Sequence, residues 1–337
     1  MLLLPFFSRP PLPPGLTERQ GLPGLRLRAL QNDTAATLLA HAYDHPRTCL
    51  SLICGTGVNA ALWLPVAALH PAKFACRPEA WAADAARRRR RVLVNSECSM
   101  LGGGGFALTD ADRLLDAAAE APGFQPFEQL TGGRYLGEVA RLTLVQAGLA
   151  CPGRWSLSSA VLALFELCVS SGVCVLGVLL PCFALLMTGR DRDVTRGEAT
   201  SAFEQTYGLQ LAPAESDFVA AVCRAVSRRA AAHLAVMLHA LYRVLDAGDK
   251  DEDDGGTGPD AGADADADAD ADANTGAVEV ACCGAVLEKH PTARTQCQGF
   301  LDALAGPGRI VLAVAEDSSL MGAAVGAVVA SGDDGAQ

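Results

Sequence analysis

The amino-acid sequence predicts an α/β fold. Short apolar segments that end in polar or glycine-containing loops have the length and composition of β-strands, and they lie at 48–53, 92–94, 277–282 and 309–315. Longer segments have the apolar periodicity of helices, and they lie at 35–43, 110–119, 135–149, 212–245 and 322–330. With 337 residues, of which 50% are hydrophobic, the chain can bury one substantial core or two modest ones.

The first 20 residues are expected to be irregular. They form a short apolar stretch that prolines interrupt, without the cleavage site of a signal peptide. Residues 25–30 then alternate as a strand does, and Asn32-Asp33-Thr34 precedes the predicted helix at 35–43. Asn32 or Asp33 therefore fits the N-cap of that helix.

Polar and glycine residues follow three of the predicted strands. They are Asn32-Asp33-Thr34, then Gly55-Thr56-Gly57 with Asn59, and then Asn95-Ser96-Glu97. Such groups at a sheet edge suit the recognition of a polyhydroxyl ligand, and phosphate transfer to a hydroxyl needs a carboxylate base and backbone donors. Asp33 is a candidate for the base, and the glycines allow N–H groups to approach a phosphate. Taken singly, a helix cap and an ordinary loop are the simpler interpretations of these motifs.

The segment 246–276 differs in composition from its surroundings. It is acidic, contains glycine and carries an alternating Ala-Asp repeat with almost no apolar surface to bury. We expect a disordered insertion there. The domain thus comprises 21–245 and 277–331.

An apolar segment at 157–187 is atypical of the surface of a globular domain. Residues 167–187 are uncharged and long enough to span a bilayer, and Arg190 and Arg192 follow them. A membrane-anchored protein is therefore one alternative. The flanking segments together have the pattern of one globular domain, which argues against a membrane-spanning helix.

Charge and composition exclude several kinds of site. The net charge of −11 argues against nucleic acid as the main partner, because phosphate contacts need a basic surface. The 12 cysteines form no Cys-x-x-Cys pair and the six histidines no His-Glu-x-x-His motif, so no protein-bound metal is predicted. Any metal would arrive with a nucleotide, and we expect a cytoplasmic protein with reduced thiols.

Five motifs taken in order resemble the hexokinase family. They are Ala29–Thr34, Ile53–Ala60, Val94–Glu97, Pro122–Glu128 and Thr131–Glu138. The resemblance covers about 21–149, resumes at 207–244, and includes 284–291 and 316–324. It implies the large domain of an actin-like ATPase (ribonuclease H-like) fold, with a mixed sheet flanked by helices and an active-site cleft that faces a smaller domain.

The resemblance also implies roles for single residues. Asp33 matches the general base that accepts the proton of the sugar 6-hydroxyl as this oxygen attacks the γ-phosphate of ATP bound to Mg²⁺. The sugar-binding positions correspond to Asn32, Asn59, Glu97, Gln125 and Glu128. The nucleotide-binding positions correspond to Gly55, Thr56, Gly57, Gly133, Arg134 and Gly284.

The chain departs from the family in three places. Nothing before Leu25 resembles the family's N-terminal domain with its first phosphate loop, so we expect this chain to correspond to the larger C-terminal domain. Ala285 replaces a serine of the adenosine loop, and Leu320-Met321 replaces a glycine-lysine pair. The alternative to a working kinase is thus a non-catalytic, sugar-sensing or regulatory protein, with a protein partner on the face that the small domain would cover.

Overall fold

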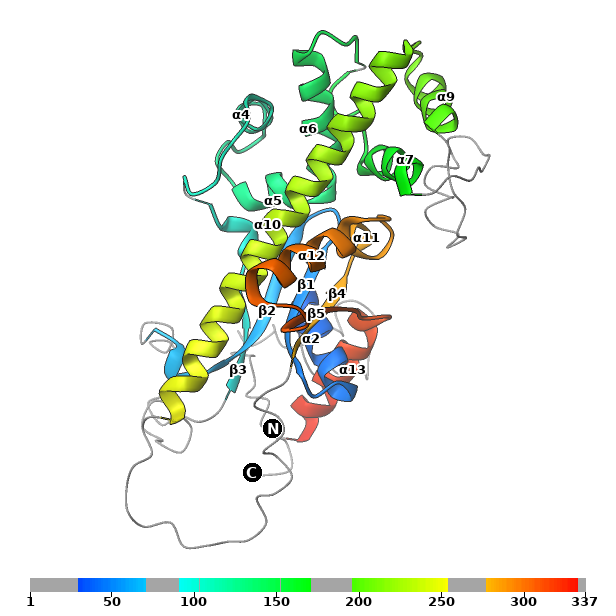
Figure 1. Ribbon diagram of the computed structural model, residues 1–337. Coiled ribbons are helices and arrows are strands. Elements are labelled where there is room, and N and C mark those ends of the chain that lie inside the picture. Colours follow the sequence, from blue (N-terminus) through cyan, green and yellow to red (C-terminus); the bar gives the residue numbers. More distant parts are fainter. Residues whose placement is uncertain are drawn as a thin grey trace, which may run out of the picture.

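The computed structural model describes residues 30–70, 91–102, 104–151, 153–170, 196–253 and 277–332 (Figure 1). At its centre is a five-stranded mixed sheet with the strand order β3-β2-β1-β4-β5. The predicted irregular segment 1–20 lies outside the described residues, as does all of the predicted strand 25–30 except its last residue.

The strand directions bring the polar loops to one edge of the sheet. The strands are β1 (Thr48–Cys54), β2 (Val58–Pro65), β3 (Arg91–Asn95), β4 (Val278–Cys283) and β5 (Ile310–Val314). β4 is parallel to β1 and to β5, whereas β2 is antiparallel to both β1 and β3. β1, β3, β4 and β5 therefore all end at the edge where β2 begins, which we call the carboxyl edge.

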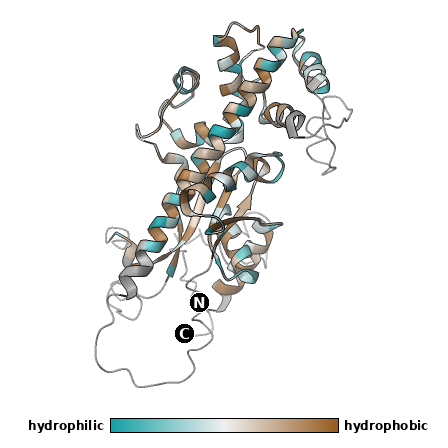
Figure 2. Ribbon diagram, in the orientation of Figure 1, coloured by the Kyte–Doolittle hydropathy of each residue, from teal (hydrophilic) through white to brown (hydrophobic). Residues whose placement is uncertain are grey.

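Helices cover both faces of the sheet. On one face, α2 (Asp33–Asp44) packs with Ala61, Trp63 and Leu93 of the sheet, and α13 (Ser318–Gly332) lies against α2. On the other face, α10 (Pro213–Asp253), α11 (Ala285–Glu288) and α12 (Ala293–Ala305) bury alternate residues of β1 and β2. Figure 2 shows hydrophobic stretches on the sheet and on the helices that cover it. Successive side chains of β2 therefore point alternately into the two layers.

Gly322 allows α2 and α13 to pack closely. A Cβ at Gly322 would lie 2.0 Å from the carbonyl oxygen of Ala36, so no larger residue fits while the helices keep this spacing. The side-chain hydroxyls of Thr37 and Ser318 share a buried hydrogen bond of 3.0 Å. This contact fixes the start of α13 relative to α2.

A second core lies beyond the sheet. It contains α4 (Asp110–Ala117), α6 (Gly133–Gln146), α7 (Ser159–Ser170) and α9 (Arg196–Tyr207), packed on the first half of α10. The second half of α10 belongs to the core on the sheet. One long helix therefore joins the two cores, as Figure 1 shows.

The structure confirms the predicted strands at 48–53, 92–94, 277–282 and 309–315 and the five predicted helices, with bounds shifted by a few residues in most cases. The predicted disordered insertion was wrong for residues 246–253, because α10 continues to Asp253. Extending a formed helix adds a hydrogen bond for each residue fixed, which costs less than nucleating a new helix. Residues 254–276 lie outside the described part of the chain.

Part of the atypical apolar segment is an ordinary core helix. α7 covers residues 159–170, and its Leu162 and Phe165 are fully buried in the second core. In the described residues we find no helix with both the length and the apolar character needed to cross a bilayer. Residues 171–187 are not among those that the structure describes.

We expect one buried ion pair to stabilise the second core. The Arg229 guanidinium of α10 donates 2.6 Å and 2.8 Å hydrogen bonds to Asp112 of α4, whose side chain is 5% exposed. Replacement of Arg229 by methionine leaves this carboxylate buried without its cation, so we expect the free energy of unfolding, measured in urea, to fall by about 3 kcal/mol. The exposed pair of Arg113 and Asp110 is the control, and Arg113→Met should cost roughly 0–1 kcal/mol.

This effect should depend on pH. Burial alone would raise the pKa of Asp112, but hydrogen bonds from Arg229 and Thr109 and the charge of Arg229 hold this pKa below its ordinary value. A lowered carboxyl pKa stabilises the fold above the ordinary pKa, and the stabilisation is lost as the pH falls through the lowered value. The difference between wild type and Arg229→Met should therefore shrink in acid, and equal stability of the two at neutral pH would contradict the account.

Candidate functional site

The carboxyl edge of the sheet collects the predicted site residues from distant parts of the sequence. The turn Gly55–Gly57 joins β1 to β2, Asn59 lies at the start of β2, and Glu97 follows β3. Gly284 follows β4, and α5 (Pro126–Thr131) with Glu128 packs on β2. α2 begins near the same edge, because the Ser51 hydroxyl of β1 donates to the carbonyl oxygen of Thr34.

The turn after β1 is held by the start of α6. The amide of Gly133 donates to the Gly55 carbonyl at 2.8 Å, and the amide of Arg134 donates to the Thr56 carbonyl at 3.1 Å. These bonds satisfy two of the N–H groups that a helix start leaves unpaired. Neither bond involves the N–H groups of Thr56 and Gly57, which are the donors that a phosphate at this turn would need.

Gly284 allows the loop after β4 to touch the same turn. Its φ of +104° is a conformation that residues with a side chain rarely adopt. A Cβ at this position would lie 2.6 Å from the carbonyl carbon and oxygen of Cys54. Both predicted nucleotide-side loops, at 55–57 and at 284, are therefore in backbone contact.

A polar network joins β2 to the loop after β3. Asn59 Nδ2 donates to Asn95 Oδ1 at 2.7 Å, and Asn95 Nδ2 donates to the Glu97 carboxylate. Glu97 has a left-handed backbone (φ 49°, ψ 44°) and an exposed side chain. Asn59 and Asn95 alternate with Ala60 and Val94, which puts their side chains on the face that α2 covers. The two amides fix the position of an acceptor group at the surface.

The carboxylate of Glu128 lies against the turn between β1 and β2. Its Oε2 accepts a 3.1 Å hydrogen bond from the amide of Val58, and a Cβ at Gly57 would lie 2.4 Å from this oxygen. Gln125, the N-cap of α5, has a left-handed backbone (φ 50°) and donates to the Ser99 hydroxyl at 3.4 Å. In this position the Glu128 carboxylate occupies the space that a Cβ at position 57 would need.

Asp33 is the first residue of α2, and Asn32 is its N-cap. Asn32 Oδ1 accepts from the Thr34 amide at 2.9 Å, and Asp33 Oδ1 accepts from the same amide at 2.8 Å. Both side chains are exposed at the start of the helix. Within the described residues, the hydrogen bonds of the Asp33 carboxylate stay inside this first turn. The carboxylate lies on the same side of the sheet as Asn59 and Asn95 but is not hydrogen-bonded to them.

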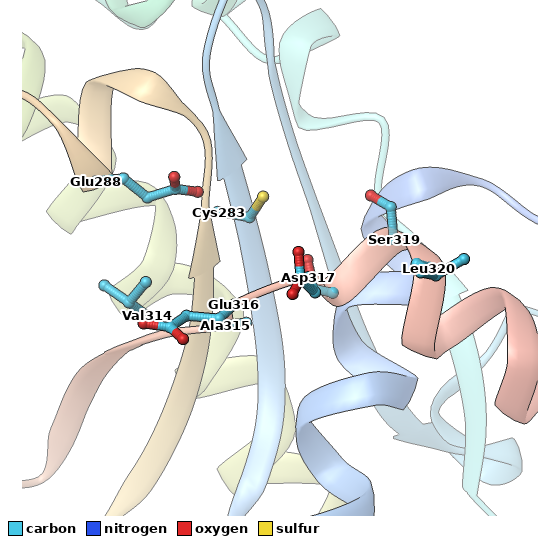
Figure 3. A pocket seen from close by; sticks show the side chains of 9 residues that line it. Cys283, Glu288, Val314, Ala315, Glu316, Asp317, Ser319 and Leu320 are labelled. Atoms are coloured by element: carbon cyan, nitrogen blue, oxygen red, sulfur yellow. The ribbon is translucent and has the colours of Figure 1, made fainter. Parts of the chain in front are cut away.

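A cavity of about 580 Å³ opens beside Gly284 (Figure 3). It lies between the ends of β4 and β5 and the start of α13, and its lining consists of Cys283, Glu288 and residues 314–320. Burial raises the pKa of the Cys283 thiol above its ordinary value, so the thiol is neutral at physiological pH. In Figure 3 the Glu288 carboxylate and Asp317 lie on either side of the Cys283 side chain.

Sequence reasoning missed two parts of this region. Asn95 lies within one of the matching motifs but was not predicted to be a site residue, although its amide links Asn59 to Glu97. Residues 316–319 also lie in a matching segment, but no role was predicted for them. Their nearness to Gly284 follows from the parallel pairing of β4 and β5, which short strand patterns do not specify.

Comparison with known proteins gives the family. The model of the hexokinase family matches residues 49–329, which is most of the chain. The chain belongs to the hexokinase family. Hexokinase-2, chloroplastic, of Nicotiana tabacum is 37% identical over 131 residues, a stretch that covers 38% of this chain and 23% of the tobacco protein. Hexokinase-1 of Schizosaccharomyces pombe is 26% identical over 252 residues, or 70% of this chain and 45% of that protein.

Solved hexokinase structures share the fold. A crystal structure of a hexokinase aligns with a TM-score of 0.65 and 25% identity over 93% of this chain and 57% of that one. The hexokinase of Schistosoma mansoni complexed with glucose aligns with a TM-score of 0.60 and 22% identity over 90% of this chain. The mixed sheet with helices on both faces is thus the expected actin-like ATPase fold, and the chain spans little more than half of each structure.

The contact between Gly284 and Cys54 makes a prediction about stability. In Gly284→Ala the new Cβ meets backbone atoms and the positive φ is strained, so we expect the free energy of unfolding to fall by about 2–4 kcal/mol. Gly299→Ala is a matched control, because it lies in α12 with open space around the added methyl group and should be neutral or slightly stabilising. Chemical denaturation compares the two variants, and equal effects would show that the contact is unimportant.

Proposed function

We propose that this hexokinase-family chain binds a hexose and ATP with Mg²⁺ at the carboxyl edge, and that it promotes phosphate transfer to the sugar 6-hydroxyl. The observation that carries the proposal is the meeting of three kinds of group at one edge. These are an exposed carboxylate at the start of α2, a glycine turn with a fixed backbone, and an amide–carboxylate network. Phosphoryl transfer to an alcohol uses a base, phosphate-binding amides and hydroxyl-binding groups of these kinds.

Sugar recognition is proposed for Asn32, Asn59, Glu97, Gln125 and Glu128. A carboxylate accepts hydrogen bonds from two hydroxyls, and an amide can both donate and accept. Asn95 holds Asn59 and Glu97 at a set spacing, and the Val58 amide holds Glu128. Groups that are already positioned need little reordering when the sugar binds, which supports selectivity for a particular arrangement of hydroxyls.

The nucleotide is proposed to lie along the 55–57 turn with its adenosine toward the cavity beside Gly284. The turn of Gly55, Thr56 and Gly57 would bind phosphate through the N–H groups of Thr56 and Gly57, because the Gly55 N–H already donates to the Gly57 carbonyl. Gly133 and Arg134 hold that turn in place. The volume of the cavity supports this orientation, as does its position beside the end of β4, where Gly284 contacts Cys54 just before the turn. Ala285 and Leu320 stand where the family has other residues. Binding of the adenosine is therefore the part of the proposed function that is most different from the family pattern.

Mg²⁺ would be held mainly by the phosphates. Mg²⁺ prefers six oxygen ligands in octahedral geometry and keeps several waters, so the protein needs to supply only one nearby carboxylate. Among the described residues, the carboxylates at the carboxyl edge, such as Asp33 and Glu97, stand apart from one another. They do not converge as several ligands of one metal ion. The donor set fits a metal that enters with the nucleotide and supplies charge neutralisation there.

Asp33 would act on the sugar hydroxyl. As the 6-oxygen bonds to the γ-phosphorus and the bond to the ADP oxygen breaks, the hydroxyl proton moves to the Asp33 carboxylate. The first turn of α2 positions this group, because Asn32 caps the helix and the Thr34 carbonyl is tied to Ser51. The carboxylate is exposed and therefore within reach of a bound sugar.

A coupled assay with glucose and MgATP tests the proposal. Asp33→Asn keeps the size of the side chain and removes the base, so we expect turnover to fall by about 100-fold or more while glucose binding, measured by calorimetry, changes little. Asp44→Asn, at the exposed opposite end of α2, is the control and should keep wild-type turnover.

Each result has a defined meaning. Turnover that is the same in wild type and Asp33→Asn would remove Asp33 from the mechanism. Glucose binding without turnover in the wild-type chain would contradict catalysis and favour a sugar-binding protein.

A further inference from the structure

A cluster of metal-binding side chains lies at the edge of the sheet opposite the proposed site. One ligand atom from each of His41, His45 and Glu279 lies within 4.8 Å of the others. It is the one group of three or more such residues that converges within the described ranges. Glu279 lies near the start of β4 and pairs with Thr48 at the start of β1, far along both strands from the loops at the carboxyl edge.

The backbone fixes the three residues relative to one another. His41 lies in the last turn of α2 and His45 is its C-cap, and the His45 amide donates to the His41 carbonyl. The amide of Glu279 donates to the Arg47 carbonyl at 3.0 Å, which ties β4 to the turn after the helix. Two histidines four residues apart lie on one side of a helix, a spacing that suits a shared metal ion.

A hydrogen bond orients the ring of His41. His41 Nδ1 is bonded to the Thr48 hydroxyl at 2.7 Å, which orients the ring. Such a bond from the second ring nitrogen is typical of metal-binding histidines and leaves Nε2 as the ligand.

We propose that His41, His45 and Glu279 form a binding site for a divalent transition-metal ion of the zinc type. Two imidazoles and one carboxylate make a donor set that such ions prefer over Mg²⁺, and three protein ligands leave a fourth position for water. The proposal is independent of the proposed kinase function, because none of its residues belongs to the carboxyl edge.

Binding requires the ring of the most exposed ligand to reorient, because the ring nitrogens of two parallel, stacked imidazoles do not point at one ion. The two rings are stacked, with centroids 4.1 Å apart and planes at 12°. Ligand atoms of a tetrahedral zinc site lie about 3.4 Å apart, so the cluster must contract by roughly 1 Å. The His45 side chain is 54% exposed and can turn toward the others, whereas His41 is buried and Glu279 is 13% exposed.

Arg47 is the competitor for the same carboxylate. Its guanidinium donates to Glu279 Oε1 at 2.8 Å, while Oε2 lies 3.7 Å from His45 Nδ1. Because the Arg47 side chain is 63% exposed, it can move into water when an ion binds Glu279. Without metal, Arg47 offsets the charge of a largely buried carboxylate.

Zinc titration of the full chain tests the site. The tag-free, reduced protein is titrated with Zn²⁺ in competition with a chromogenic chelator, and wild type is compared with His45→Ala, Glu279→Gln and His70→Ala. We expect His45→Ala and Glu279→Gln each to weaken the tightest site by about tenfold or more. His70→Ala removes an exposed histidine outside the cluster and should leave that site unchanged.

Cobalt spectra distinguish this cluster from the cysteines. Co²⁺ bound to the cluster gives ligand-field bands without the near-ultraviolet charge-transfer band of thiolate ligands. Equal zinc affinity in all four proteins, a thiolate band, or no stoichiometric binding would each overturn the proposal. Loss of kinase turnover alone would not bear on it.

Discussion

The close backbone contact at the turn between β1 and β2 is the constraint on which the proposed site depends. Gly55 and Thr56 cap the start of α6 with their carbonyls, Gly284 touches the residue before the turn, and Gly57 leaves space for the Glu128 carboxylate. Three segments far apart in the sequence therefore meet at one turn. A Cβ at Gly284 would overlap the backbone of Cys54, and one at Gly57 would overlap the Glu128 carboxylate in its present position, whereas Gly55 has room for one.

The remaining architecture supports this turn from both faces of the sheet. The pair α2 and α13 positions Asp33 on one side, and the Thr37–Ser318 hydrogen bond couples the start of α13, which lines the cavity, to α2. On the other side, α10 joins the sheet to the helical core that contains α6. The capping of α6 by the turn thus connects the second core to the site. A change that moves α6 should also shift the backbone of the turn, because packed elements transmit displacement.

Much of the scaffold could be predicted from the sequence, since apolar strands and amphipathic helices are encoded locally. β2 was missed because both of its faces are covered, so the run 60–64 lacks the alternation of a half-exposed strand. The helix end at Asp253 was missed because composition does not show how far a long helix propagates. Residues of the site were found through motifs, but the Asn95 bridge, the cavity and the cluster of His41 with Glu279 depend on strand pairing between distant segments.

Hydrogen–deuterium exchange with and without glucose tests the central claim most directly, namely that the carboxyl edge is the sugar-binding edge. We expect saturating glucose to slow the exchange of amides in 55–59, 95–97 and 125–128, while amides at the opposite edge, in 45–48 and 277–280, stay unchanged. Protection confined to these loops would match the account. Unchanged exchange at the carboxyl edge, or protection that appears only elsewhere in the chain, would contradict it.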